Sequence, residues 1–138
     1  MDIQQVSHQG RLWAMVIRGG RVAPGVHFVT PDDNALQVGK QWRTQGTVIA
    51  AHAHCAVAAR EQDGFLQEVL HIERGKVKVV FYTDDGTHVE ECVLAAGDTI
   101  LLIQGGHGFE VLEDTQMLEI KMGPYDPASK KNLEARSR

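Results

Sequence analysis

The sequence predicts an all-β domain, folded as a sandwich or a small barrel. Short runs of aliphatic and aromatic residues recur along the chain, and in several of them apolar residues alternate with polar ones. Turn sequences separate these runs, with DDG at residues 84–86, AAGD at 95–98 and QGGHG at 104–108. The chain has 138 residues, which suits a single domain with one core.

Ten segments fit strands by composition and period. Between and after them, residues 31–36 fit a turn or one short helical turn, residues 55–65 fit a polar loop, and residues 126–138 fit one or two helical turns. The predicted strands cover residues 12–18, 25–30, 36–43, 47–54, 66–73, 76–83, 88–94, 99–104, 108–114 and 115–122.

Composition and charge exclude several classes of function. Hydrophobic residues make up 43% of the chain and the formal net charge is -4, so its bulk charge does not suit nucleic-acid binding. The basic stretch at residues 129–138 fits a solvated C-terminus. Cys55 and Cys92 are too few for a disulfide framework and have no CxxC spacing. No segment is apolar over the length of a signal peptide or membrane span, so we expect a cytoplasmic protein without membrane or nucleic-acid partners.

Two histidines in the segment GTVIAAHAHC, residues 46–55, suggest a metal site. His52 and His54 are two positions apart, so on a strand their side chains share one face. Cys55 would point to the other face and fit a small buried hydrophobe. A histidine pair alone fits a polar strand face as well as a metal site, so the prediction depends on further ligands.

The histidine pair belongs to a longer pattern. Gly46, five residues, His52, one residue and His54 resemble the first half of the first cupin motif. Glu68, six residues and Gly75 resemble its second half, after a gap from His54 that is longer than the family's usual one.

The segment from Gly97 to His107 is similar to the second cupin motif, although it lacks that motif's proline. The resemblance covers residues 46–122 and implies a single-domain double-stranded β-helix, a jelly-roll-like barrel of two antiparallel sheets. It also implies that four inward side chains hold one divalent metal. These side chains are His52, His54, Glu68 and His107.

The resemblance divides the chain into three parts, of which the middle one, residues 46–122, forms the cupin barrel. Residues 1–45 supply N-terminal strands that pack on the barrel or at a dimer interface, and residues 123–138 form a C-terminal tail. Strands beyond those that a minimal barrel needs could pair between subunits, so we expect a homodimer.

The ligand types favour a first-row transition metal, namely manganese, iron, nickel, copper or zinc. Three imidazoles and a carboxylate leave coordination positions open for water or substrate, which indicates chemistry at the metal. We expect Glu68 and His54 to be the catalytic residues, with Gln67 as a further polar group that steers a proton. Phe109 and Ile120 would form the apolar walls.

Several residues also fit roles outside a metal site. Glu68 could instead be a buried acid paired with Arg43 or Arg60, in a barrel that binds no metal. Lys121 and Tyr125 fit a packed tail better than a substrate contact. The remaining histidines fit structural or exposed positions, with His71 and His88 predicted to face solvent; the others are His8 and His27.

The sequence thus leaves three functions open. The first is a metalloenzyme, an isomerase, epimerase or dioxygenase-type cupin, acting on a small polar molecule, with a sugar or sugar derivative favoured. The second is a metal-independent nucleotide-sugar ketoisomerase or epimerase that uses a histidine base. The third is a non-catalytic cupin that binds a small ligand.

Overall fold

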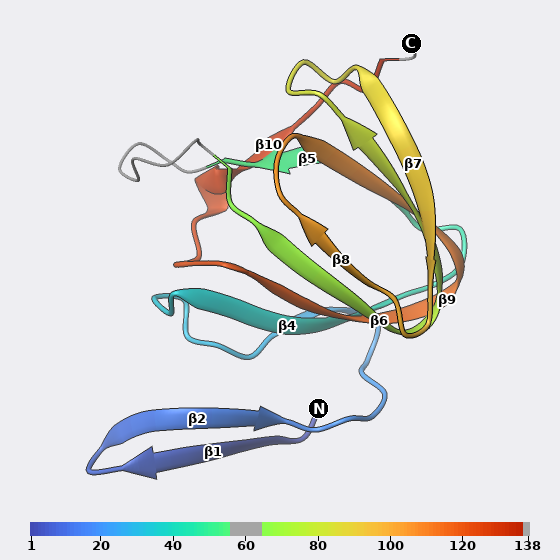
Figure 1. Cartoon of the computed structure of the whole chain (residues 1–138). Coiled ribbons are helices and arrows are strands. Elements are labelled where there is room, and N and C mark those ends of the chain that lie inside the picture. The colour runs from blue at the N-terminus through green and yellow to red at the C-terminus, as the bar shows by residue number, and fades with distance from the viewer. Residues whose placement is uncertain (56–64, 137–138) are drawn as a thin grey trace.

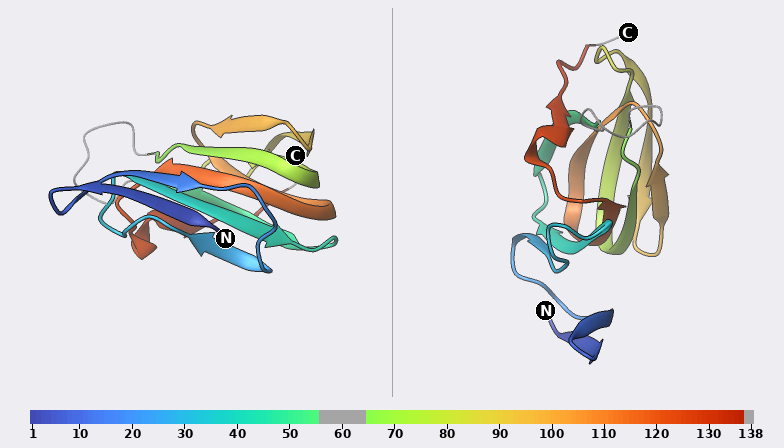
Figure 2. Two further views of the ribbon diagram at one scale, coloured as in Figure 1. Left: turned by 90° about the horizontal axis from the view of Figure 1, so that it is seen from below. Right: turned by 90° about the vertical axis from the view of Figure 1, so that its left-hand side faces the viewer.

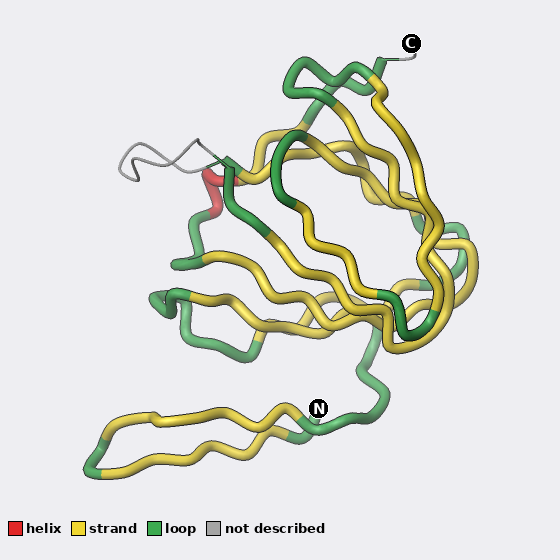
Figure 3. The backbone as a smooth tube through the Cα atoms, in the orientation of Figure 1, coloured by secondary structure: helices red, strands yellow, loops and turns green. Residues whose placement is uncertain are grey.

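The structure is a computed structural model that describes residues 1–55 and 65–136 and consists almost wholly of strands (Figure 1; Figure 3). The all-β prediction is confirmed. The elements are β1 (Ile3–His8), β2 (Arg11–Ile17), β3 (Gly25–Phe28), β4 (Leu36–Arg43), β5 (Val48–His54), β6 (Glu68–Tyr82), β7 (His88–Ala95), β8 (Thr99–Leu102), β9 (Gly106–Met122), a 3-10 turn (Pro127–Ser129) and β10 (Lys130–Asn132). Within the described ranges, no helix has the length and apolar character needed to cross a membrane.

Eight of the strands form one curled sheet. Its main path runs β10-β5-β9-β4-β3, and β6 joins it by pairing with β9 while also pairing with β7 and β8. All of these pairings are antiparallel. Because β9 pairs with β5 over its first half and with β4 over its second half, the sheet wraps around one interior (Figures 1 and 2).

Two long strands replace four predicted ones. Residues 66–73 and 76–83 were expected as separate strands, but β6 runs through both, and β9 likewise joins 108–114 to 115–122. Register shifts near Gly75 bend β6 without ending its pairing with β9. Gly75 has a φ of +87°, and a Cβ there would lie 2.3 Å from the carbonyl oxygen of Asp114, so the bend requires glycine.

The chain ends differ from the sequence prediction. The strand β1 was not predicted, and among the described residues it pairs only with β2, in a separate two-stranded sheet. Residues 126–138 were expected to form helical turns, but the described part of this segment, residues 126–136, contains a single 3-10 turn followed by β10. β10 exists because its backbone pairs with β5, which is a tertiary contact. The domain boundary at residue 45 stays a prediction, while β3 and β4, on its N-terminal side, pair into the large sheet.

The core fills one end of the barrel interior. Phe109 belongs to it, as predicted, but Ile120 is only half-buried and lies on the other face of β9, because its neighbours Met117 and Glu119 face inward. The core side chains are Leu70, Ile72, Val77, Val79, Leu102, Phe109 and Met117. The opposite end of the interior is polar.

Candidate metal centre

Three histidines converge at the polar end of the barrel. His52 and His54 lie at alternate positions of β5, and His52 is the direct cross-strand neighbour of His107 on β9. One ligand nitrogen from each ring lies within 4.8 Å of the others. The ring centroids are 4.6 Å apart for His52 and His107 and 5.0 Å apart for His52 and His54. The sequence therefore predicted correctly that these three side chains meet.

The backbone fixes the tautomer of His52. Its Nδ1 lies 2.8 Å from the carbonyl oxygen of Ala50. A carbonyl oxygen only accepts, so Nδ1 carries the proton and Nε2 presents its lone pair. A hydrogen bond from the ring nitrogen that does not bind the metal is the usual way in which a protein orients a histidine ligand.

Glu68 begins β6 and stands beside the histidines. Its Oε2 lies 3.4 Å from Nε2 of His54. Within the part of the chain that the structure describes, Oε2 of Glu68 and Nε2 of His107 are buried and accept or donate no hydrogen bond. Buried polar atoms without partners are costly, and a cation bound among these side chains would satisfy both. The residues present therefore fit a metal ion.

Arg43 is not the partner of Glu68, so that alternative is wrong. The Nε of Arg43 donates instead to Oε1 of Gln41, over 2.9 Å. The other alternative partner, Arg60, and the predicted loop between Cys55 and Phe65 lie in residues 56–64, outside the described residues.

Burial shifts the protonation of all four groups. It raises the pKa of Glu68 to about 8, helped by the nearby charge of Glu119. It lowers the pKa of His54 to about 4 and of His107 to about 3, and it lowers that of His52 as well. At neutral pH the imidazoles are thus neutral, as metal ligands must be, while the carboxyl keeps its proton unless a cation replaces it.

A cavity of about 170 Å³ opens beside the cluster. Its lining includes polar residues besides the ligands, and two of these, Gln41 and Glu119, carried no signal in the sequence. Glu119 is buried, accepts a hydrogen bond from Nε2 of Gln41 over 2.9 Å, and lies 3.3 Å from Nζ of Lys121. The lining residues are Val26, Phe28, Gln41, Arg43, Ile49, His52, His54, Glu68, Leu70, Phe109, Met117, Glu119, Lys121 and Lys130.

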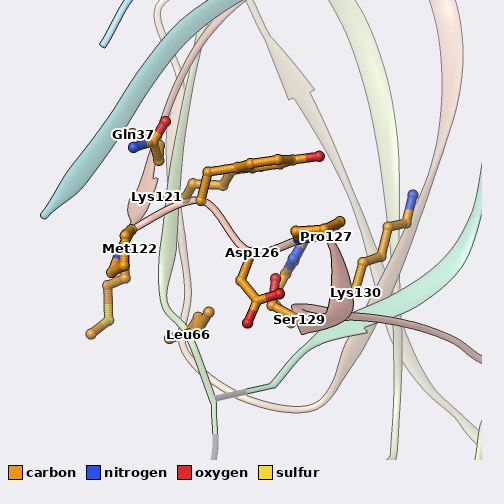
Figure 4. A pocket seen from close by; sticks show the side chains of 11 residues that line it. Gln37, Leu66, Lys121, Met122, Asp126, Pro127, Ser129 and Lys130 are labelled. Atoms are coloured by element: carbon orange, nitrogen blue, oxygen red, sulfur yellow. The ribbon is translucent and has the colours of Figure 1, made fainter. Parts of the chain in front are cut away.

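A second cavity of similar size lies under the C-terminal tail (Figure 4). It shares His54, Lys121 and Lys130 with the first cavity and is also lined by Tyr125. Lys121 therefore faces the candidate site, and Tyr125 is 53% exposed, so the expectation that both belong to a packed tail is wrong. The tail forms a wall of the site instead.

The remaining candidates lie away from the cluster. His71 and His88 are half-buried rather than fully exposed, and Nδ1 of His71 lies 2.9 Å from Oγ1 of Thr99. Gln67 is exposed, so it cannot be the polar neighbour of Glu68 inside the barrel. Glu119 occupies that position.

No family model matches the sequence, and no curated protein matches it. Solved structures do match. The chain is similar to an oxalate decarboxylase from Bacillus subtilis, with a TM-score of 0.61 and 19% identity over 82% of this chain and 29% of that one. The chain thus spans less than a third of that enzyme's length.

Two further structures match over most of both chains. A protein with a double-stranded β-helix domain from Klebsiella pneumoniae has a TM-score of 0.60 and 16% identity, covering 86% of this chain and 85% of that one. A cupin-superfamily protein from Desulfitobacterium hafniense has a TM-score of 0.56 and 11% identity, covering 77% and 83%. The chain has the cupin fold, a double-stranded β-helix, as its motifs predicted.

Proposed function

We propose that this cupin binds one divalent transition metal and acts as an enzyme on a small molecule that bears an acidic group. The observation that carries the proposal is the meeting of three histidine nitrogens within 4.8 Å of one another, beside the buried carboxyl of Glu68. His52, His54, Glu68 and His107 would be the ligands. Nitrogen donors with one carboxylate oxygen suit manganese, iron, nickel, copper or zinc.

When bound, such an ion would polarise a substrate oxygen or lower the pKa of a water molecule. The chain's own residues supply the rest of the chemistry. Glu68, whose pKa is raised to about 8 by burial, can hold a proton near neutral pH at Oε2, next to His54. Glu119 and Gln41 lie in the same cavity and can bind substrate hydroxyl groups.

The charges around the cavities favour an acidic substrate. Lys121 and Lys130 line both cavities, and so does His54, one of the proposed metal ligands. Two ammonium groups beside the metal ligands would attract a carboxylate and hold it there. A sugar acid or another short hydroxy acid combines this group with the hydroxyls that Gln41 and Glu119 can bind, so the favoured sugar derivative is an acidic one.

The metal-free isomerase is the weaker candidate. A histidine base works best with a pKa near the working pH, whereas burial lowers the pKa values of His54 and His107 to about 4 and 3. Ligand pockets for larger molecules span roughly 300–1,000 Å³. The cavity here is about 170 Å³, which suits a smaller molecule than a nucleotide sugar.

Metal analysis tests the first part of the proposal. The untagged protein, and variants His52→Ala, Glu68→Ala and His107→Ala, would be analysed by inductively coupled plasma mass spectrometry after reloading and desalting. We expect about one transition-metal ion per chain in the wild type, by the ligand count, and a loss of most of it in each variant. The control is His88→Ala, which removes a histidine outside the cluster. Equal metal content in wild type and His107→Ala would reject the site.

Substrate binding tests the second part. Titration calorimetry of the metal-loaded protein would compare short hydroxy acids with neutral sugars of the same length. We expect binding of the acids alone, and at least a tenfold loss of affinity in Lys121→Met, since each tenfold corresponds to about 1.4 kcal/mol. Lys131→Met is the matched control, because Lys131 lines neither cavity. NMR of the same mixtures separates turnover from binding alone.

A further inference from the structure

A cleft also lies on the outer face of the barrel, away from the candidate metal centre. Its lining includes three direct cross-strand neighbours, Trp42 on β4, Gln116 on β9 and Arg74 on β6. Their chain neighbours Gln41 and Met117 line the inner cavity, so strand alternation places the cleft on the opposite face of the sheet. This outer cleft has a volume of about 360 Å³, and among the described residues it shares no lining side chain with either cavity of the candidate site.

Two arginines line the outer cleft beside one aromatic ring. The guanidinium carbon of Arg21 lies 4.2 Å from the centroid of the Trp42 ring, and that of Arg74 lies 5.9 Å from it. A guanidinium that lies over a ring contacts it with its flat side, and the N–H groups at its edge stay available to an acceptor. The cleft therefore presents two sets of charged donors.

Neither arginine has an acid partner in the described part of the chain. Other cations of this barrel do, since four lysines each pair with a glutamate, namely Lys40, Lys76, Lys78 and Lys121. Glu73, the acid that lines the cleft, is already engaged at both oxygens. Its Oε1 pairs with Lys40, and its Oε2 accepts from Nε2 of Gln116 over 2.6 Å. Two positive charges thus stay uncompensated in the cleft, in a chain of net charge -4.

Hydrogen bonds within the chain fix the walls of the outer cleft. Oε1 of Gln116 accepts from the backbone N–H of Val22 over 3.0 Å, and its Nε2 donates to the carbonyl oxygen of Gly20 over 2.8 Å. These bonds hold the segment of Arg21 against the barrel, so binding there has little backbone to order. Trp42 is 4% exposed, and its indole N–H has no acceptor among the described residues, so this donor is also available to a ligand.

Charge and size favour a small phosphate ester as the ligand. A phosphoryl group carries a charge of about -1.5 to -2 at neutral pH and has three acceptor oxygens. This matches two guanidinium groups, whereas one arginine is enough to bind a carboxylate through both of its oxygens. The volume of about 360 Å³ lies at the lower end of the range for ligand pockets, roughly 300–1,000 Å³, so the ester is a small one.

We propose that the outer cleft is a second binding site, which takes the phosphoryl group of a small phosphate ester between Arg21 and Arg74, beside the ring of Trp42. The site lies on the face of β4 opposite to the cavity of the candidate metal centre. The inference goes beyond the proposed function, and it holds with or without a bound metal.

Titration calorimetry of the full chain with inorganic phosphate, glycerol phosphate and succinate tests the site, at low salt and with a chelator present. We expect saturable binding of both phosphates, with a stoichiometry of one per chain, and much weaker binding of succinate. Arg21→Gln and Arg74→Gln should each lower the affinity for phosphate at least about tenfold, because each removes charge-assisted hydrogen bonds. Both side chains are exposed, so the variants should keep the circular dichroism of the wild type.

Three further variants separate the outer cleft from other sources of positive charge. Arg11→Gln removes an arginine that does not line the cleft, and Lys121→Met removes a charge of the inner cavity, so both should bind phosphate as the wild type does. Arg74→Lys keeps the charge without the planar fork and should lose part of the affinity.

Four results would overturn the proposal. Unchanged affinity in Arg74→Gln would place the phosphate elsewhere, and a loss in Lys121→Met equal to that in Arg74→Gln would place it in the inner cavity. An equal loss in Arg11→Gln would assign binding to bulk charge alone. Succinate bound as tightly as phosphate would reject a phosphoryl group as the ligand. Because the chelator removes free metal, none of these results bears on the proposed metal centre.

Discussion

The two ends of the barrel interior are built by the same strands and differ in chemistry. On β6 the inward side chains run from Glu68 at one end to Leu70 and Ile72 toward the other. On β9 they run from Glu119 to Met117 in the same direction. The apolar end is a core of buried hydrophobic side chains, whereas the polar end contains two buried atoms without hydrogen bonds in the described structure.

The difference between the two ends indicates that the polar end is the candidate functional site. Side chains at the apolar end stabilise the protein simply by leaving water. Those at the polar end lose solvation, and burial shifts their pKa values in the direction that opposes charge. Buried polar atoms need a partner for their lone pairs, and the metal proposed above would be that partner.

Truncation at the apolar end should have the largest effect on stability. Ile72 is fully buried, so Ile72→Ala should lower the free energy of unfolding by about 2–5 kcal/mol, through lost burial and the cavity left behind. Urea denaturation in the presence of a chelator measures this. The control Val48→Ala, at a side chain 72% exposed, should change it by no more than about 0.5 kcal/mol. A small loss for Ile72→Ala would show that this end is not close-packed.

Metal should stabilise the polar end independently of the core. A ligand at about one hundred times its dissociation constant raises the free energy of unfolding by about 2.7 kcal/mol. We expect this gain in the wild type and in Ile72→Ala, which keeps the ligands, but not in His107→Ala. Thermal denaturation with and without added metal provides the measurement. A full gain in His107→Ala would place the bound metal elsewhere.

Ionisation of Glu68 should destabilise the metal-free protein as the pH rises from 6.5 to 8. Because the pKa of Glu68 is raised to about 8 in the folded state, the folded protein binds a proton in this window that the unfolded chain has released. The contribution of Glu68 to stability then falls with pH, by about 2 kcal/mol over the window. The three histidines, whose pKa values are lowered, act in the opposite direction, because the unfolded chain is still releasing their protons above pH 6.5; together they add about 1 kcal/mol over the same window.

Glu68→Gln tests the source of this slope. In chemical denaturation with a chelator present, the stability of the variant should rise by about 1 kcal/mol from pH 6.5 to 8, through the histidines, whereas that of the wild type should fall slightly. Metal should also remove the contribution of Glu68 in the wild type, because it binds the ionised carboxylate in place of the proton. The same change of stability with pH in Glu68→Gln and in the wild type would assign the fall to another group.

The outer face of the same strands should matter least. Nζ of Lys76 on β6 lies 2.9 Å from Oε1 of Glu113 on β9, and both side chains are well exposed. Exposed ion pairs contribute at most about 1 kcal/mol, so Lys76→Ala should lower the free energy of unfolding by no more than that. Urea denaturation at low and high salt measures it. A larger loss would mean that the outer face also stabilises the barrel.

Much of the fold could be predicted from alternation and turn chemistry, because most strands are local patterns. The continuity of β6 and β9 could not, since the bend at Gly75 interrupts the period while pairing continues. β10 could not be predicted either, because a strand of Lys130–Asn132 has no apolar pattern and exists only through its pairing with β5.

The candidate site was predictable only in part. The alternation of His52 and His54 indicated a shared face, the resemblance to the cupin motifs added His107 as a ligand, and the structure brings these side chains together. The segment MLEIKM, residues 117–122, led to a wrong prediction. Its alternation predicts that Ile120 faces inward and Glu119 outward, whereas the structure has the reverse. A charged residue inside a barrel is favourable only in the tertiary context of its partners, which local sequence does not contain.

Anomalous diffraction from crystals of the metal-loaded protein, collected at the absorption edge of the bound element, tests the central claim most directly. The account predicts one strong peak at about 2.0–2.3 Å from nitrogens of His52, His54 and His107, with Glu68 as the fourth protein ligand. A peak bound by other residues, or no peak between the three histidines in fully loaded crystals, would contradict it.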